Sequence, residues 1–304
     1  MAHVPRAGIG RAPVSKRDGR IGWLFALPWV FGFTVFLLYP VVASLFLSFT
    51  SYSILKPPRL IGTANYVELY HDPIFWKSLS NTFLYVLGAV PLGTVMAIAL
   101  ALLLNSKVKG MAVYRTLFFL PTLVPMAALG VLFLWIFNGD YGILNAGLKL
   151  VHLPLPNWLG DPAWSKWTLI LISVWGCGQA MIIYLAGLQD VPVSLYEACE
   201  IDGASSWART RAVTLPLISP VILFNVIMGI IGSLQVFAVP YIMFMDGAPA
   251  RSTYVFTSYL LDNAFKFQRM GYACALGWVM FVITLILTLL SMKIAERHVH
   301  YEGG

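Results

Sequence analysis

A polar segment of the chain, residues 191–216, carries acidic and small residues at a spacing that suits a specific contact with another surface. If the segment is helical, Ala198 and Cys199 share one face, where their small side chains would let another surface approach closely. Glu197 and Glu200 flank that face and could pair with basic groups. The chemistry expected here is recognition by shape and charge. An amphipathic hairpin lying on lipid is the alternative, but such helices are typically rich in Lys and Arg on their polar face.

Two short helices are expected to position these groups. Ser194 followed by Glu197 fits a capping box, in which the serine side chain accepts from the glutamate amide, so the first helix should begin at Leu195. Gly203 permits a left-handed turn that would end this helix. Ser205 can then cap the second helix.

The composition indicates that membrane helices carry this segment. Of the 304 residues, 59% are hydrophobic and 11% are charged, against about 25% charged residues in an ordinary soluble domain. Six runs without Asp, Glu, Lys, Arg or His each exceed the roughly 18 residues that mark a candidate span; they are residues 21–49, 82–104, 116–137, 167–189, 217–245 and 271–292. We therefore predict an all-α integral membrane protein with six transmembrane helices. Prolines inside or beside the runs predict kinks.

The distribution of Lys and Arg predicts that both termini are cytoplasmic, because cytoplasmic segments of membrane proteins carry an excess of these residues. With the N-terminus inside, twelve of the 20 basic residues fall in cytoplasmic segments: Arg6, Arg11, Lys16, Arg17, Arg20, Lys107, Lys109, Arg115, Arg209, Arg211, Lys293 and Arg297. The expected organisation is a cytoplasmic tail at 1–20, a six-helix domain at 21–297 and a cytoplasmic tail at 298–304. The basic residues lie in short clusters between apolar runs rather than on one solvated face, so no nucleic-acid partner is expected.

The spans lack the groups that catalysis or ion coupling would need. A membrane enzyme usually needs a general base or a metal ligand near its substrate, and all five histidines lie in tails or loops. Cys177, Cys199 and Cys274 are too few and too scattered for a zinc site. The sequence contains no G-x-x-x-x-G-K-[ST] phosphate loop. We therefore expect no catalytic residue and no metal site, and the energy for any uphill transport must come from another subunit.

A few polar and aromatic residues inside the spans are candidates for a solute path. Asn225, Ser233, Gln235 and Gln179 could line such a path or form hydrogen bonds between helices. The two interpretations are balanced for Gln235, whereas hydrogen bonding between helices is favoured for Gln179. Trp175 could pack in the core or present a flat apolar face to a sugar ring.

The polar segment resembles a known motif. Glu197-Ala198-Cys199, Asp202-Gly203-Ala204 and Leu215-Pro216 are similar to the EAA loop of ATP-binding-cassette (ABC) importer permeases, E-A-A-x-x-D-G-A-x-x-x-x-x-F-x-x-I-x-L-P. The chain departs from this pattern at Cys199, Thr210 and Val213. Other segments resemble the carbohydrate branch of the family, of the maltose and glycerol-phosphate type: Leu195-Tyr196, Trp207, Tyr39-Pro40, Ser48-Phe49-Thr50, Asn157-Trp158-Leu159 and Gly247-Ala248-Pro249.

The resemblance implies a type I ABC importer permease of a bacterial-type cytoplasmic (inner) membrane. In that family two permeases, usually different chains, form the path. Two copies of a cytoplasmic ATPase bind ATP and Mg and dock on the EAA loops, and an extracytoplasmic solute-binding protein delivers the solute. The positions implied to dock on the ATPase are Glu197, Ala198, Asp202, Gly203 and Ala204. Those implied for the substrate path are Ser233, Gln235 and Phe237, with Asn225 and Trp175 as further candidates.

The expected function is the import of a carbohydrate, either a sugar or an oligosaccharide, by a chain that binds no cofactor itself. One alternative is the same machine for another solute, such as glycerol phosphate or a peptide. An anionic solute would favour cationic groups in the path, and the spans have none. A polytopic membrane enzyme is the other alternative, and it would need catalytic residues that the spans also lack.

Overall fold

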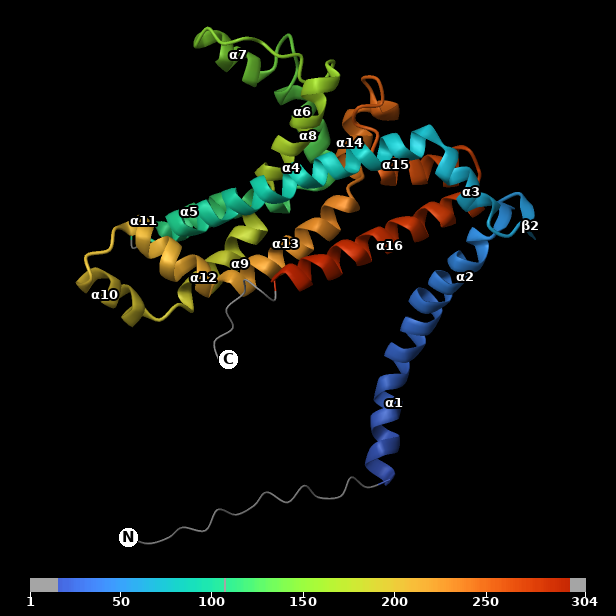
Figure 1. The fold of residues 1–304 in the computed structure, drawn as a ribbon, viewed down its shortest axis with the longest axis horizontal. Helices are drawn as coiled ribbons and strands as arrows, with labels where there is room; N and C mark the ends of the chain where they lie inside the picture. Colours follow the sequence, from blue (N-terminus) through green and yellow to red (C-terminus); the bar gives the residue numbers. More distant parts are fainter. Residues whose placement is uncertain (1–15, 107, 296–304) are drawn as a thin grey trace.

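The computed structural model describes residues 16–106 and 108–295. The tail at 298–304 and most of the tail at 1–20 lie outside these residues. The described chain forms an elongated bundle of helices (Figure 1). One end of the bundle carries α10 (Val193–Ile201), and we call it the α10 end. The opposite end carries α3 (Ala64–His71) and α15 (Phe256–Leu261), and we call it the α15 end.

The first helical rod leaves the bundle at the α15 end and projects away from it (Figure 1). It consists of α1 (Lys16–Phe33), a π-helical turn η1 (Thr34–Leu38) and α2 (Tyr39–Ser48). In its most apolar 18-residue window, none of the described residues is buried. Its contact with the bundle is made by α2 against α16 (Met270–Ala295), where Trp278 Nε1 donates to Ser44 Oγ at 3.2 Å.

A hairpin and a long central helix follow. Strands β1 (Thr50–Ser53) and β2 (Lys56–Leu60) pair antiparallel, and α4 (Pro73–Leu104) then runs through the bundle. α4 begins well before residue 82, where its apolar run starts, because Asp72 accepts from the Ile74 amide at 2.8 Å and Pro73 occupies the first turn. The helix therefore carries polar residues that the hydropathy pattern assigned to a loop.

The third apolar run is broken, so the prediction of a single helix over 116–137 was wrong in its geometry. α5 (Met111–Phe119) and a 3₁₀ turn η2 (Leu120–Leu123) meet α6 (Met126–Ile136) at an angle of 100°. Val124 is extended because the following Pro125 disfavours the helical conformation of the residue before it. The kink expected from the prolines is present here.

The fourth run is bent by 45° between α8 (Pro162–Trp175) and α9 (Gly178–Gln189). α7 (Ile143–Leu150) precedes this pair in the loop. A Cβ on Gly178 would lie 2.5 Å from the Phe118 carbonyl oxygen, so only glycine lets α9 pack this closely against α5.

The fifth run is also interrupted, which corrects the expectation of one helix over 217–245. α13 (Ser219–Leu234) ends before Gln235, and α14 (Ala238–Met243) begins after Phe237. The remaining elements are the 3₁₀ turn η4 (Met245–Gly247), α15, the π-helical turn η5 (Asp262–Lys266) and α16.

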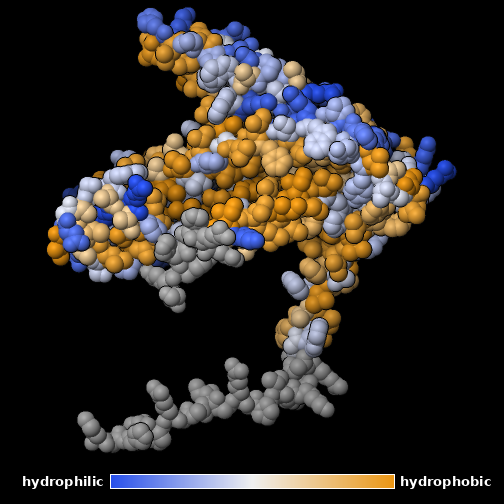
Figure 2. Space-filling view, in the orientation of Figure 1, coloured by the Kyte–Doolittle hydropathy of each residue, from blue (hydrophilic) through white to orange (hydrophobic). Residues whose placement is uncertain are grey.

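The surface of the bundle is apolar over most of its length, as a membrane protein requires (Figure 2). Within the described residues, four helices are long and apolar enough to cross a membrane, and the number rises to six if each bent pair is one span. The prediction of a helical membrane protein is therefore confirmed, with four to six candidate spans among the described residues.

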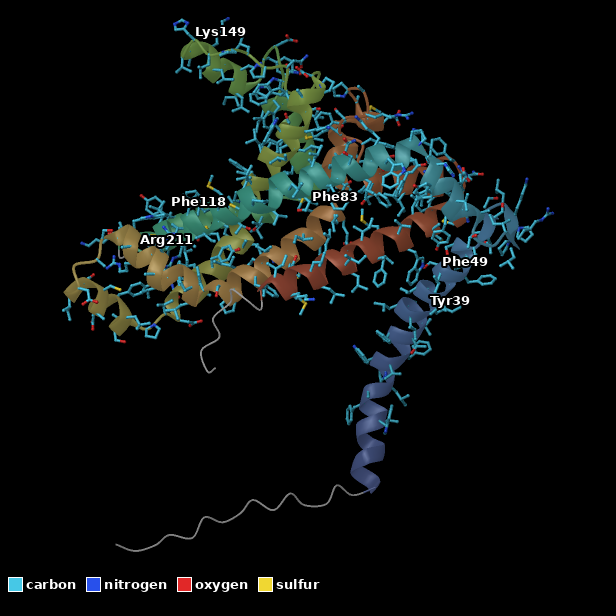
Figure 3. All side chains as sticks on the ribbon, in the orientation of Figure 1. Tyr39, Phe49, Phe83, Phe118, Lys149 and Arg211 are labelled. Atoms are coloured by element: carbon cyan, nitrogen blue, oxygen red, sulfur yellow. The ribbon has the colours of Figure 1, made fainter. Side chains whose placement is uncertain are left out.

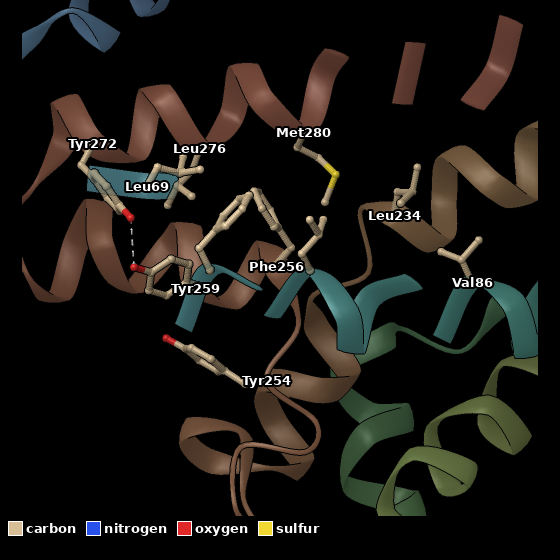
Figure 4. Close-up of a cluster of buried hydrophobic side chains, with 11 residues drawn as sticks. Leu69, Val86, Leu234, Tyr254, Phe256, Tyr259, Tyr272, Leu276 and Met280 are labelled. Carbon is tan, nitrogen blue, oxygen red and sulfur yellow. Dashed lines mark hydrogen bonds between the residues drawn. The ribbon is translucent and has the colours of Figure 1, made fainter. Parts of the chain in front are cut away.

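Three apolar clusters of described residues hold the bundle together. The cluster at the α15 end contains Phe256, Tyr259, Tyr272 and Leu276 (Figure 4). Its tyrosines also carry a polar network, in which Tyr259 Oη and Tyr272 Oη both donate to the carboxylate of Asp72, the latter at 2.9 Å. This network ties the start of α4 to α15 and α16.

Candidate functional site

The segment with the EAA-like motif forms a compact helical hairpin at the α10 end. α10 starts at Val193, with Pro192 in extended conformation as its N-cap. Ser194 therefore lies inside the helix, and the expected capping box with Glu197 was wrong. Gly203 has a φ of +71°, as predicted for the turn that ends the helix. The amide of Ala204 reaches back to the Cys199 carbonyl at 2.9 Å.

The second half of the hairpin begins at α11 (Ser206–Arg209), whose first turn is capped as predicted. Ser205 Oγ accepts from the amide of Ala208 at 3.3 Å. The chain continues through a π-helical turn η3 (Thr210–Thr214) and α12 (Leu215–Leu217) into α13. The departure from the motif at Thr210 thus falls where the helix changes its hydrogen-bonding pattern.

The hairpin is fixed to the bundle through Tyr196. Its hydroxyl lies 3.2 Å from Thr214 Oγ1, its ring packs against the apolar cluster around Met181 and Tyr184, and the Arg209 guanidinium lies 5.7 Å from the ring centre. Glu197, Ala198, Asp202 and Gly203 are exposed, and Ala204 is half-buried. The residues expected to dock on an ATPase thus lie together on a surface that is open for contact.

Two large apolar side chains of the hairpin are highly exposed, and the sequence analysis did not identify them as contact residues. Ile201 is 87% exposed and Trp207 is 71% exposed. Large apolar groups this exposed at the tip of a polar hairpin suit a protein contact. The sequence does contain a sign of this exposure. Ile201 directly precedes the Asp202-Gly203 turn, at the end of α10 and away from the apolar core.

A second site is a cavity of about 580 Å³ where the broken fifth run meets α4, α8, α9 and η2. Its polar side chains come from Tyr85, Thr122, Ser173, Gln179, Ser233 and Gln235. Phe237 also lines the cavity, whereas Asn225 and Trp175 are not among the described residues that do. Asn225 donates to Val221 O of its own helix at 3.0 Å, and Trp175 packs near Phe133. We call this the polar cavity.

The polar cavity is built on the interruption between α13 and α14. Gln235, Val236 and Phe237 lie outside both helices, and Phe237 has a φ of −143° and a ψ of −60°. Non-helical backbone at membrane depth is tolerated where it lines a cavity, because the freed backbone groups need polar partners there. Sequence reasoning found Gln235 and Ser233 from their polarity. It assigned Gln179 to helix contacts and missed Tyr85, which lies on the α4 face that meets α8.

The chemistry of the polar cavity is that of hydrogen bonding without charge. Among the described residues that line it, none is Asp, Glu, Lys or Arg. Hydroxyl and amide groups can donate to and accept from the hydroxyl groups of a solute. Within residues 16–106 and 108–295, no group of three or more His, Cys, Asp or Glu could hold a metal ion.

Residues 89–300 match the family described as binding-protein-dependent transport system inner membrane component. The chain belongs to this family. It is therefore a multi-pass inner-membrane permease of a transport system, and ATP hydrolysis is the task of a separate subunit.

Relatives of the permease cover nearly its whole length. The probable ABC transporter permease protein YesP of Bacillus subtilis (strain 168) is 41% identical over 95% of this chain and 94% of its own. The lactose transport system permease protein LacF of Rhizobium radiobacter is 37% identical over 91% of this chain and 94% of its own. The expectation of an ABC importer permease is confirmed by the family and these relatives.

A solved structure supports the fold. A chain in the crystal structure of a bacterial alginate ABC transporter, in complex with its alginate pentasaccharide-bound periplasmic protein, matches with a TM-score of 0.82. The match covers 94% of this chain and 98% of that chain at 24% identity. The permease therefore has the type I fold of that transporter's membrane subunit.

Proposed function

We propose that the permease conducts a carbohydrate, a sugar or an oligosaccharide, through the polar cavity. The observation that carries this proposal is the broken helix around Gln235, which brings uncharged hydrogen-bonding side chains from several helices to one cavity of about 580 Å³. Such a volume lies within the range of about 300–1,000 Å³ typical of small-molecule sites. A solute with many hydroxyl groups matches these donors and acceptors.

The names of relatives support a carbohydrate. They include transport permeases for lactose, for sulfoquinovosyl glycerol and for arabinooligosaccharides, which are 37%, 34% and 30% identical to this chain. A peptide or glycerol phosphate is the alternative solute. Both carry charges, for which the described lining of the polar cavity offers no opposite charge.

The assembly that we propose contains three kinds of partner. A second permease, a different chain as is usual in the family, covers the projecting α1–α2 rod. Two copies of an ATPase, which bind ATP and Mg, dock on Glu197, Ala198, Asp202, Gly203 and Ala204 and drive transport. A solute-binding protein docks outside the membrane at the α15 end.

The proposed topology has six spans, each bent pair counting as one, and both termini in the cytoplasm. The α10 end then faces the cytoplasm and the α15 end faces outward. The domain organisation is a tail at 1–20, the permease domain at 21–297 with its coupling segment at 191–216, and a tail at 298–304.

The test is transport by the complete complex in proteoliposomes, with its ATPase and binding protein. ATP-dependent uptake is measured for labelled oligosaccharides, for a dipeptide and for glycerol phosphate. Uptake of an oligosaccharide alone supports the proposal. Uptake of the peptide or of glycerol phosphate, with no carbohydrate transported, would overturn it.

A further inference from the structure

The helix α7 has an apolar face that the described chain leaves uncovered. Four uncharged residues recur at i, i+3, i+4 and i+7 and therefore share one side of the helix: Ile143, Ala146, Gly147 and Leu150. We call them the exposed α7 face. Ile143 is 71% exposed and Leu150 is 82% exposed. Apolar surface of this extent in a folded protein marks a contact with another apolar surface.

The opposite side of α7 holds the helix in place. The side chain of Asn145 is buried, and its Nδ2 donates to the Gly139 carbonyl at 2.9 Å and to the Pro156 carbonyl at 3.3 Å. Trp158 Nε1 in turn donates to Asn145 Oδ1 at 2.8 Å. Leu148 packs against the apolar cluster that contains Trp158. These contacts join α7 to both ends of its own loop and fix which side of the helix points outward.

The exposed α7 face continues the apolar surface of α6. Figure 1 shows α7 next to α6, displaced to one side of the bundle. A groove of about 720 Å³ lies between α6 and the start of α7. It is lined by Ala128, Val131, Leu132, Trp135, Ile136, Tyr141 and Ile143. The α6 side of the groove belongs to a candidate membrane span, for which lipid is the ordinary neighbour. Ile143 therefore faces the same surroundings as the exposed side of α6.

Aromatic side chains near α7 mark the depth of the headgroups. Trp135, Tyr141 and Trp167 are exposed, and the Trp164 ring lies edge to face with Trp158, 5.0 Å between the ring centres. Trp and Tyr gather at the boundary between membrane and water, because each ring has an apolar body and a polar tip. This places α7 at the boundary and not in the middle of the bilayer.

The charge of the α7 segment favours phospholipid as its neighbour. Between Tyr141 and Gly160 the sequence contains one lysine, Lys149, and no Asp, Glu or Arg. Lys149 is exposed and lies at the far tip of α7 (Figure 3). Successive residues of a helix are about 100° apart, so Lys149 flanks the exposed α7 face beside Leu150. A lysine so placed can extend its ammonium group to a lipid phosphate while the apolar face meets the acyl chains.

We propose that α7 is an interfacial helix that lies in the outer leaflet of the membrane. The exposed α7 face contacts the acyl chains, and Lys149 lies among the phosphates. An interfacial helix of this kind buries its apolar face about 5–10 Å into the boundary between headgroups and acyl chains. The choice of leaflet rests on the proposed topology, whereas the contact with lipid rests on the groove and on the exposed α7 face.

This contact would set the depth of one wall of the polar cavity. The apolar cluster against which Leu148 packs also contains Leu129 and Leu169, and both of these residues line the polar cavity. A helix fixed to this cluster on one side and to lipid on the other holds the wall at a defined depth in the bilayer.

The experiment measures the surroundings of α7 in the complete transporter, reconstituted in vesicles of phosphatidylethanolamine and phosphatidylglycerol. A spin label is attached to Ile143→Cys or Leu150→Cys on the exposed α7 face, and to Lys149→Cys beside it. Oxygen concentrates among acyl chains, whereas a water-soluble nickel chelate stays in water. The ratio of oxygen collisions to chelate collisions should be several-fold higher at positions 143 and 150 than at position 149.

Three controls keep the measurement specific. The transporter without an introduced cysteine, treated in the same way, gives the background from Cys177, Cys199 and Cys274. Ala146→Cys, a smaller change on the exposed α7 face, should give the same high ratio as Leu150→Cys and replaces it if that variant assembles poorly. Co-purification of the partner subunits checks the assembly of every variant.

Three outcomes would overturn the inference. If neither oxygen nor the chelate reaches positions 143 and 150, another protein chain such as the second permease covers the exposed α7 face. If the chelate reaches both positions until the solute-binding protein is added, that protein is the partner. If the chelate reaches them under all conditions, α7 lies in water. The reporter placed near Pro156 tests the side of the membrane separately, so an error in topology is distinguishable from an error in the lipid contact.

Discussion

Arg209 Nη1 donates to Glu200 Oε1 at 2.6 Å across the turn at Gly203. This ion pair joins α10 to α11 and holds the exposed Glu197 and Asp202 on one hairpin. Both side chains are partly solvated, so the pair adds about 0–1 kcal/mol to stability. The pair mainly fixes the shape of the hairpin. The hairpin in turn contacts the bundle through Tyr196.

Gly203→Val should uncouple transport from ATP hydrolysis. No described atom lies within 4 Å of a Cβ at this position, so the added Cβ meets no other part of the chain. The penalty comes from the φ of +71°, since a left-handed residue other than glycine costs roughly 1–2 kcal/mol. We expect normal membrane insertion but loss of uptake and of solute-stimulated ATP hydrolysis.

The matched control for this variant is Gly110→Val. Gly110 also has a positive φ, +81°, and open space around it, but it lies outside the coupling segment. Gly110→Val should therefore keep transport coupled to ATP hydrolysis, although the valine has a similar free-energy cost for its left-handed backbone conformation. Equal loss in both variants would mean that strain alone, and not docking, explains the effect.

Gln235→Leu should slow transport through the polar cavity. A hydrogen bond is worth about 1 kcal/mol net, so uptake per assembled complex should fall about fivefold. Gln189→Leu, which removes an exposed amide at the end of α9, serves as the control. If uptake per complex is unchanged and only the amount of complex falls, Gln235 is a helix contact and not part of the path.

A reporter that is active only outside the cytoplasm tests the topology. Fused after Gly304 it should be silent, whereas inserted near Pro156 or Ala250 it should be active. The reverse pattern would invert the proposed orientation, and activity at all three positions would contradict the count of six spans.

Low pH should destabilise the network around Asp72. Burial raises the pKa of Asp72, but hydrogen bonds from Tyr259, the Ile74 amide and Tyr272 outweigh it and lower the pKa below its ordinary value. The contribution to stability is therefore present above about pH 4 and is lost as pH falls through the lowered pKa. Thermal unfolding of the complex between pH 7 and pH 3 should show a smaller acid-induced loss for Asp72→Asn than for the native chain.

High pH acts on the same network through Tyr259. Burial, and then the hydrogen bond to Asp72, raise the pKa of Tyr259 to about 12. The neutral phenol is favoured in the folded chain, so its contribution is present below about pH 10 and is lost as pH rises towards 12. In Tyr259→Phe, the stability should fall less steeply as the pH rises from about 10 to 12. An unchanged fall would mean that other groups cause the loss of stability at high pH.

Hydropathy predicted where the apolar runs lie but not where they break. A run such as 217–245 is equally apolar whether its helix is continuous or interrupted at Gln235. The interruption goes with different packing partners, since α13 packs against α4 and α14 packs against α6. The break at Pro125 could be foreseen because proline restricts the residue before it. The turn at Gly203 was also predictable from local sequence, because a glycine after a short helix favours the left-handed conformation that ends it.

Lys77 and Lys166 fall outside the predicted helices because the limits of each apolar run were taken as the limits of a helix. Asp72-Pro73 and Asp161-Pro162 are both start signals, with an aspartate N-cap before a proline in the first turn. Reading these pairs would have put Lys77 and Lys166 on helices. Their proximity depends on how α4 packs against α8, which no local pattern contains.

Because the α1–α2 rod is exposed, the stability of the folded chain depends on the molecules that surround it. The intrachain contacts fix the rod near Ser44 and Trp278, while the apolar surface from Trp23 to Phe36 is left to lipid or to another chain. Whatever binds that surface stabilises the folded chain by an amount that rises with the logarithm of its local concentration. A cell that makes the subunits unequally would therefore hold the surplus chain in a less stable state, open to proteolysis from its first helix.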